Sequence, residues 1–290
     1  MKFLVTGAKG FIGTHLVEAL ESRAHEVFKI TSNNRGVLDY QNFEQFIGEE
    51  IDVLVHLAGK TFVPESWDKP ASYLNQNVIG TLNSLEFCRN TKSKLIYISS
   101  YMYGSPDYLP VDEKHPIKVF NPYGLSKRMA EEVCEFYRDN FGMSVVIMRP
   151  FNIYGPGQNS NFLIPFILDQ LVNGTEVKVK DLAPKRDFLF IADFIDSILK
   201  VADITVNTGT FNIGSGMSYS VQEIIDQSQS ILGTNYPSSD SGERRENEVM
   251  DVVADISELR RECNWVPQHS LKDGLKACID LLNKPITSTE

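Results

Sequence analysis

Tyr123 and Lys127 lie four residues apart in a segment with helical periodicity, which continues through the apolar residues Met129, Val133 and Phe136. Side chains with this spacing lie on one face of a helix, one turn from each other. A phenol has an ordinary pKa of about 10, and a nearby ammonium, helped by a cationic cofactor, stabilises the phenolate. Lowering the pKa by about three units takes roughly 4 kcal/mol. The pair therefore predicts a tyrosine that exchanges a proton with an alcohol or ketone, although the same spacing also occurs by chance on many helices.

Ser99 follows the apolar run 94–98, at the point where a strand is expected to end. A hydroxyl there can point into a cleft and hydrogen-bond the same substrate oxygen as Tyr123, which helps to move its proton. The alternative is a strand-end serine that caps a turn.

Gly7, Gly10 and Gly13 follow the apolar strand 3–5 and precede a helical pattern over 14–20. The first glycine permits a tight turn, and the second lets backbone N–H groups approach a pyrophosphate. The third lets the helix pack closely on its strand. The alternative is a glycine-rich turn that only packs. With a strand before it and a helix after it, the turn predicts a dinucleotide site, at which a hydride moves while the tyrosine exchanges its proton.

Apolar strands alternate with helical patterns along the first half of the chain. This alternation predicts a parallel sheet with right-handed crossovers and helices on both faces. The fold class is therefore α/β, a doubly wound parallel sheet (Rossmann) with a smaller α/β C-terminal substrate lobe. Ligands in such sheets bind at the carboxyl ends of the strands. After the first strand we expect strands at 26–30, 51–57, 94–98 and 145–148, and helices at 77–90, 123–140 and 191–201.

Proline, glycine, asparagine and serine become frequent from about residue 151, which indicates shorter elements and a second lobe. A later helix returns to the first lobe, so the two domains interleave. We expect a dinucleotide-binding domain over 1–150 plus about 187–213, and a substrate-binding lobe over about 151–186 plus 214–290.

The 290 residues carry a net charge of −10 and are 42% hydrophobic, which is typical of a globular protein that does not bind nucleic acid. No stretch approaches the roughly 20 apolar residues of a membrane span. The early glycine turn leaves no room for a cleavable signal before the fold. The cysteines lack paired or metal-type spacing, so we expect reduced thiols in a cytoplasmic protein without a metal site. They are Cys88, Cys134, Cys263 and Cys278.

Further motifs accompany the glycine turn along nearly the whole chain. They are the segments 56–59, 77–81, 121–123, 149–157, 186–188, 211–216 and 265–267. In this order they resemble the extended short-chain dehydrogenase/reductase family, which comprises nucleotide-sugar epimerases, dehydratases and 4-keto reductases. The resemblance implies that Ser99, Tyr123 and Lys127 form a catalytic triad, the same three side chains that their chemistry singles out.

The resemblance also implies the substrate contacts, because the substrates of the family are sugars carried on a nucleoside diphosphate. Arg186 and Arg245 match positions that clamp the diphosphate, and a guanidinium suits phosphate oxygens. Asn152 matches a contact to the diphosphate or sugar, and Glu248 resembles the acid that holds the nucleoside ribose. The alternative for each arginine is a surface ion pair. The implied cofactor contacts are Gly7, Lys9, Gly10, Phe11, Ile12, Gly13, Ser32, Arg35, Asp39, Leu57, Ala58, Gly59, Asn77, Tyr123 and Lys127.

Two departures from the family pattern narrow the reaction. Relatives that eliminate water carry an acidic pair after the catalytic hydroxyl, but here Ser100 and Tyr101 occupy those positions beside the substrate. No carboxylic acid is placed to protonate a leaving hydroxyl, which disfavours a dehydratase. Relatives that epimerise next to a ketone before reducing it carry a cysteine where Tyr101 stands. The remaining possibility is oxidation or reduction at a single carbinol carbon of the sugar, for which we favour C4.

The end of the second strand favours NADP over NAD. An NAD site usually has an Asp or Glu there, whereas residues 31–35 read Thr-Ser-Asn-Asn-Arg. Lys9 and Arg35 match positions that bind the 2′-phosphate in NADP-using relatives, and Asp39 resembles a contact to the adenine. The alternative for Arg35 is a solvated loop charge.

The cofactor preference bears on the reaction, because a reductase consumes reduced cofactor whereas a 4-epimerase typically retains NAD. We favour reduction of an NDP-4-keto-6-deoxyhexose, with an NDP-hexose 4-epimerase as the alternative and a non-catalytic dinucleotide sensor as a more distant one. Relatives also commonly form homodimers through a bundle of two helices per subunit, here 77–90 and 123–140. The apolar positions for such an interface, which otherwise cover the sheet, are Val78, Leu82, Leu85, Met129, Val133 and Phe136.

Overall fold

The computed structural model describes residues 1–203, 205–243 and 248–282, and a six-stranded parallel sheet lies at its centre. The strand order is β2-β1-β3-β4-β5-β9, so the direction of winding reverses between β1 and β3. In open sheets of this kind, ligands bind in the crevice at such a reversal. The strands are β1 (Lys2–Thr6), β2 (Glu26–Ile30), β3 (Val53–His56), β4 (Lys94–Ile98), β5 (Val145–Pro150) and β9 (Gly209–Ile213).

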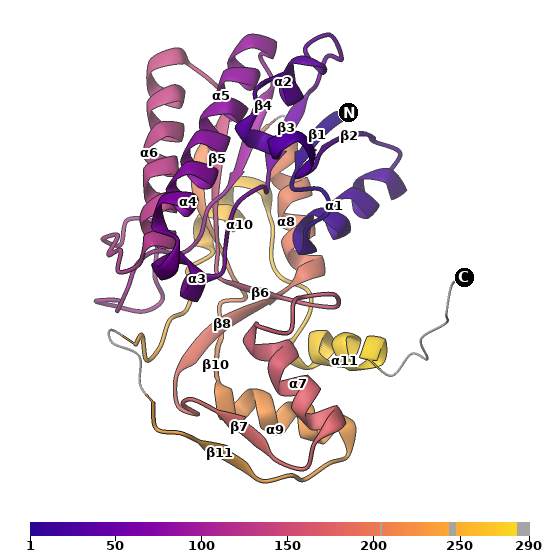
Figure 1. Cartoon of the computed structure of the whole chain (residues 1–290), viewed down its shortest axis with the longest axis vertical. Helices are drawn as coiled ribbons and strands as arrows, with labels where there is room; N and C mark the ends of the chain where they lie inside the picture. The colour runs from indigo at the N-terminus through magenta and orange to yellow at the C-terminus, as the bar shows by residue number, and fades with distance from the viewer. Residues whose placement is uncertain (204, 244–247, 283–290) are drawn as a thin grey trace.

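Helices cover both faces of this sheet, because its strands are apolar on both sides (Figure 1). Phe3 and Val5 of β1 pack into the core that contains α1 and α8, whereas Leu4 packs into the core that contains α5 and α6. The helices of this part are α1 (Phe11–Ser22), η1 (Asn33–Leu38), α2 (Gln41–Glu44), α3 (Val63–Asp68), α4 (Pro70–Leu74), η2 (Asn75–Ile79), α5 (Gly80–Thr91), α6 (Pro122–Phe141) and α8 (Ile191–Ala202).

Most of the remaining elements form a second part of the molecule, which lies below the large sheet in Figure 1. It contains a three-stranded sheet in the order β10-β8-β6 and a two-stranded pair of β11 with β7. The elements are β6 (Asn152–Tyr154), α7 (Leu163–Asn173), β7 (Val177–Val179), β8 (Lys185–Phe190), β10 (Ser218–Ser220), α9 (Val221–Leu232), β11 (Ser238–Asp240) and α11 (Leu271–Leu282), and α10 (Ser257–Cys263) packs near β9.

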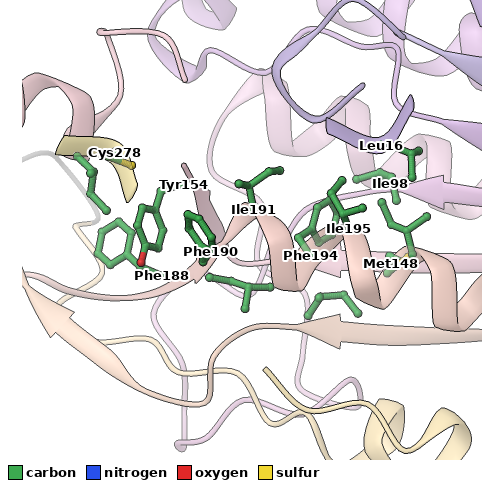
Figure 2. Close-up of a cluster of buried hydrophobic side chains, with 14 of the residues drawn as sticks. Leu16, Ile98, Met148, Tyr154, Phe188, Phe190, Ile191, Phe194, Ile195 and Cys278 are labelled. Carbon is green, nitrogen blue, oxygen red and sulfur yellow. The ribbon is translucent and has the colours of Figure 1, made fainter. Parts of the chain in front are cut away.

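One hydrophobic core joins the two parts, as Figure 2 shows. It begins between α1 and the large sheet, continues along α8 and ends among the aromatic side chains of β6 and β8. The strand β8 runs without a break into α8, so one segment of chain contributes to both sides of this core. The core includes Leu16, Ile98, Met148, Ile191, Phe194, Ile195, Tyr154, Phe188, Phe190 and Cys278.

The α/β fold class is confirmed, while several element ends differ from those expected. The third strand is shorter than 51–57, because only Val53–His56 pairs with its neighbours. The expected helix 77–90 is divided into a π-helical turn, η2, and α5. Leu85 is wrong as an interface position, because it is fully buried in the core under α5. The exact domain boundaries stay a prediction.

Three of the four thiols, Cys88, Cys134 and Cys278, are buried, and all four are free. Among the described residues there is no group of three or more acidic, histidine or cysteine side chains arranged to hold a metal ion. Within the same residues, no helix has both the length and the apolar character needed to cross a bilayer.

Candidate active site

The start of α6 sets the positions of Tyr123 and Lys127. Asn121 caps the helix, since its side-chain oxygen accepts a hydrogen bond of 2.8 Å from the Gly124 N–H, and Pro122 occupies the first helical position. An asparagine cap followed by proline fixes where a helix begins. Tyr123 therefore lies in the first turn, and Lys127 follows on the same face one turn later.

The Lys127 side chain is buried against the end of β4. Its Nζ donates a hydrogen bond of 2.8 Å to the carbonyl of Ile98 and lies 5.0 Å from the centre of the Tyr97 ring. Burial lowers the pKa of Lys127 to about 8, and the Glu131 carboxylate opposes this decrease. The ammonium is thus held next to the strand residue that precedes Ser99.

Tyr123 is half-buried, and its ring packs edge-on against the Tyr73 ring at 6.5 Å between centroids. Burial raises the pKa of Tyr123 to about 12, and a hydrogen bond from the Ser100 side chain opposes this increase. The lowering of this pKa that Lys127 and a cationic nicotinamide are expected to cause concerns the cofactor-bound protein and stays a prediction. As it stands, the phenol is a proton donor.

Ser99 lies at the carboxyl end of β4 and is only 3% exposed. Its N–H donates to the Met148 carbonyl at 2.8 Å, which continues the strand pairing, but its hydroxyl has no hydrogen-bond partner among the described residues. A buried hydroxyl without a partner costs free energy, and a ligand oxygen at this place would remove that cost. The alternative role as a turn cap does not fit, since a capping hydroxyl would be bonded.

A buried asparagine connects the loop after β3 to the catalytic helix. The side-chain oxygen of Asn77 accepts from the Lys60 N–H at 2.8 Å, and its amide donates to the Lys60 carbonyl at 3.1 Å and to the Ser126 hydroxyl at 2.8 Å. Ser126 in turn donates to the Tyr123 carbonyl at 2.7 Å. A Cβ on Gly59 would lie 2.9 Å from the Asn77 oxygen and 3.7 Å from Lys127 Nζ, so Gly59 adjoins Lys127.

Sequence reasoning named Asn77 and Gly59 but missed Ser126 and Lys60. Ser126 stands between Tyr123 and Lys127, so its position alone was a signal. Nothing in the sequence indicates that an asparagine side chain binds both backbone groups of Lys60.

The glycine turn after β1 has the shape that a dinucleotide requires. Gly7 has φ +68°, a left-handed conformation that glycine adopts readily, and a Cβ there would lie 2.8 Å from the Ala58 nitrogen. A Cβ on Gly13 would lie 2.2 Å from the Gly7 carbonyl oxygen. The turn at Gly7 thus lies close both to residues 57–58 after β3 and to Gly13 in the first turn of α1, at the β1/β3 reversal. The residues fit a bound nicotinamide dinucleotide at this crevice.

The residues expected around the adenosine end do not share one hollow. Lys9 lines a hollow with Thr31, in which Glu21 is paired with Lys29 at 2.7 Å. Arg35 and Asp39 line a separate one. Ser32 is exposed and lines neither of them, and Arg35 is exposed with φ +66°.

The Tyr101 and Asn152 side chains contact each other where β6 of the three-stranded sheet begins. The Tyr101 hydroxyl donates to the Asn152 side-chain oxygen at 3.4 Å, and the Asn152 amide donates to the Asp187 carbonyl at 3.0 Å. The Tyr101 ring stacks on Phe151 at 4.8 Å. Asn152 is the first residue of β6, so its side chain is held directly beyond the end of β5.

Arg186 and Glu248, which the resemblance assigns to the diphosphate and the ribose, form an ion pair with each other. Arg186 also donates to the carbonyls of Lys185, at 2.8 Å, and of Val249. Both side chains are mostly buried, so this is not a surface ion pair. Arg245 lies outside the described residues.

Comparisons with known proteins place this chain among enzymes of nucleotide sugars. The model of the "NAD dependent epimerase/dehydratase family" matches residues 3–214. A "Putative UDP-glucose 4-epimerase" of Methanocaldococcus jannaschii is 31% identical over 96% of this chain and 97% of its own. The "GDP-6-deoxy-D-mannose reductase" of Pseudomonas aeruginosa is 30% identical over 96% of both. The solved structure of RMD from Pseudomonas aeruginosa complexed with NADPH has a TM-score of 0.88 at 28% identity, and covers 96% of this chain and 97% of the other.

Proposed function

Because this chain belongs to the NAD dependent epimerase/dehydratase family and is an NAD(P)-dependent nucleotide-sugar enzyme, we propose that it reduces the C4 ketone of a nucleoside-diphosphate sugar. The substrate in this proposal is an NDP-4-keto-6-deoxyhexose, and the cofactor is NADPH. The dinucleotide, when bound, supplies the hydride.

Three side chains handle the proton in this proposal. Tyr123 donates it to the ketone oxygen, which suits a phenol whose pKa burial holds at about 12. The Ser99 hydroxyl donates a hydrogen bond to the same oxygen, and this gives the buried hydroxyl the partner that it lacks among the described residues. Lys127 holds the nicotinamide ribose and stabilises the phenolate that remains after proton transfer.

The proposal of a reductase rather than an epimerase rests mainly on the absence of a carboxylate at the end of β2. Thr31 and Ser32 follow β2, and Lys9 lines the same hollow as Thr31. An uncharged strand end beside a lysine accepts a 2′-phosphate, whereas a carboxylate there would repel it. Glu18 and Glu21 also line this hollow, and the pairing of Glu21 with Lys29 offsets one of these two charges. An NADP site indicates a cofactor that is exchanged at each turnover, and the similarity to RMD with NADPH supports it.

A UDP-hexose 4-epimerase with retained NAD is the second candidate, because the 31% identical archaeal relative carries that description. The catalytic side chains would be the same, with Tyr123 first accepting and then returning the proton. A dinucleotide sensor without catalysis is disfavoured by the intact set of Ser99, Tyr123 and Lys127.

The nucleotide released when freshly purified protein is denatured separates the two candidates. Protein without dinucleotide, or with loosely held NADP, supports the reductase, which should then oxidise NADPH with an NDP-4-keto-6-deoxyhexose. Release of stoichiometric NAD, together with interconversion of UDP-glucose and UDP-galactose, would contradict the reductase and support the epimerase. As a control, the Tyr123→Phe variant should lose about 10²-fold or more in turnover while still binding NADPH. Retained turnover would contradict the role of the phenol.

We also propose a homodimer through α5 and α6. Met129 and Phe136 of α6 are 39% and 55% exposed, whereas neighbouring positions of the same helix are buried. Light scattering tests this proposal. The wild type should be a dimer, and a Met129→Glu/Phe136→Glu variant should be a monomer.

A further inference from the structure

Glu131 and Arg149 form a buried ion pair one helical turn beyond Lys127. Glu131 is fully buried on α6, and Arg149 of β5 is 4% exposed. Two hydrogen bonds join them, from Arg149 Nη2 to Glu131 Oε2 at 2.7 Å and from Nε to Oε1 at 3.0 Å. Such two-point pairing fixes the orientation of a carboxylate as well as its distance.

Arg149 is itself held from its far side, so the carboxylate has little freedom. Its Nη1 donates to the Tyr103 hydroxyl at 3.0 Å and to the Glu113 carbonyl at 3.3 Å. Tyr103 donates in turn to the Asn212 side chain at 2.6 Å. The pair is thus connected to β9 and to the loop after β4, while Glu131 stays on the helix that carries the catalytic lysine.

Glu131 is four residues after Lys127, a spacing that places the two side chains next to each other on one helix face. Removing a lysine from water favours its neutral form, and a nearby carboxylate favours the ammonium. Both effects are present at Lys127, where burial lowers the pKa and Glu131 opposes the decrease. Of the described residues, Glu131 provides the carboxylate that acts on this ammonium.

Of the described residues, Glu132 and Glu135 of α6 are further carboxylates near this place, and both are paired with Arg128, at 3.0 and 3.8 Å, while the buried histidine, tyrosine and cysteine side chains are neutral near pH 7. Burial lowers the pKa of His56 to about 3, so the ring is neutral. Burial raises the pKa values of Tyr97 and Cys134, which are neutral as well. Arg128 approaches Glu131 Oε2 at 3.6 Å and adds positive charge. The groups around Lys127 and Glu131 are therefore His56 on β3, Tyr97 on β4, Arg149 on β5, and Tyr123, Arg128, Glu132, Cys134 and Glu135 on α6.

We propose that Glu131, held by Arg149, is a positioning residue that keeps the buried Lys127 protonated for cofactor binding and catalysis. This inference rests on the proposed function, because it takes Lys127 as a ligand of the bound dinucleotide. Glu131 touches neither cofactor nor substrate in this proposal and acts through the lysine. A purely structural role of the ion pair would affect stability without moving the pH at which Lys127 loses its proton.

The test measures NADPH binding by fluorescence from pH 6.5 to 9.5, so it needs no sugar substrate, and NADH replaces NADPH if the protein prefers it. Affinity should fall at alkaline pH as Lys127 loses its proton. In Glu131→Gln the midpoint of this fall should move to lower pH by about one unit, the size of shift expected from removing one nearby opposite charge. Asp139→Asn, which changes an exposed carboxylate near the C-terminal end of the same helix, is the matched control and should leave the midpoint unchanged.

A second variant guards against misfolding, because Glu131→Gln leaves Arg149 buried without its partner. Glu131→Gln/Arg149→Met removes both charges and should shift the midpoint in the same direction by a smaller amount. An unchanged midpoint in a folded variant, judged by its thermal unfolding, would overturn the inference.

The kcat profile with the 4-keto sugar is the second readout and should show the same displacement of its alkaline limb. If the wild type reduces no such sugar but the binding midpoint still moves, the proposed reaction fails and the role of Glu131 stands.

Discussion

The Lys94→Met variant should change how stability depends on pH. Lys94 begins β4, is 7% exposed, and donates through Nζ to the carbonyl of Asp203 at 2.9 Å and to that of Val201. These carbonyls lie at the C-terminal end of α8, where helix carbonyls lack intrahelical partners. Burial lowers the pKa of Lys94 to about 8, and Asp203 opposes this decrease.

The sign of the effect follows from the protons bound in each state. The unfolded chain keeps the Lys94 proton up to its ordinary pKa of 10.5, whereas the folded protein loses it above about 8. Between these values the unfolded state binds more protons, so the contribution of Lys94 to stability rises with pH. The contribution is lowest below pH 8 and complete above pH 10.5. From pH 7 to pH 10 the gain is about 2–3 kcal/mol.

Urea unfolding at pH 7 and pH 10 measures this gain, with fluorescence of the buried Trp265 as the probe. The unfolding free energy of the wild type minus that of Lys94→Met should increase by about 2–3 kcal/mol between the two pH values, since all other titrating groups are common to both proteins. Lys276→Met, which changes an exposed lysine, should give no such increase. The same difference for Lys94→Met at both pH values would refute the reasoning.

Further predictions concern the cofactor site. Replacing both Lys9 and Arg35 with alanine should lower the affinity for NADPH far more than that for NADH. The difference should be about tenfold or more if each residue contributes a charge-assisted contact. Equal losses of affinity in binding titrations with the two cofactors would refute the NADP assignment. Gly13→Ala should lower the unfolding free energy by about 1–3 kcal/mol or more, because its Cβ would lie 2.2 Å from the Gly7 carbonyl oxygen. Gly48→Ala, where a Cβ meets no atom within 4 Å, is the control in the same thermal melt. Ser126→Ala should lower kcat about tenfold with little change in NADPH affinity, as expected for a lost hydrogen bond that only orients Tyr123, and an unchanged kcat would speak against that link.

The parts of this protein that the sequence predicted well are those controlled by local patterns. The second long helix was expected at 123–140 and is Pro122–Phe141, because Asn121 and Pro122 provide a local start signal. The glycine turn was recognisable for the same reason, since Gly7 directly follows β1 with φ +68°, a conformation that glycine adopts readily. In each case neighbouring residues determine the conformation.

Features that depend on contacts between distant segments could not be predicted from the sequence. The Lys127 ammonium donates to the Ile98 carbonyl, and burial raises the pKa of Tyr123 in the protein alone. Arg186 and Glu248, each assigned to the substrate, are bonded to one another across 62 positions of the chain. The tertiary fold determines which groups a side chain contacts, and the spacing of residues along the chain does not reveal these contacts.

The continuous core shown in Figure 2 limits how this enzyme can be recombined with its relatives. The chain passes between the large sheet and the three-stranded one at 150–152, within 190–191 and again at 213–218, so the part with the smaller sheets is not one contiguous insertion. A chimaera that grafts a foreign nucleotide-recognition region onto this sheet needs several junctions. It must also match the aromatic packing of Tyr154, Phe188 and Phe190 against α8 and α11. Natural divergence in substrate choice should therefore proceed by replacing single residues along the crevice, with the two halves inherited together.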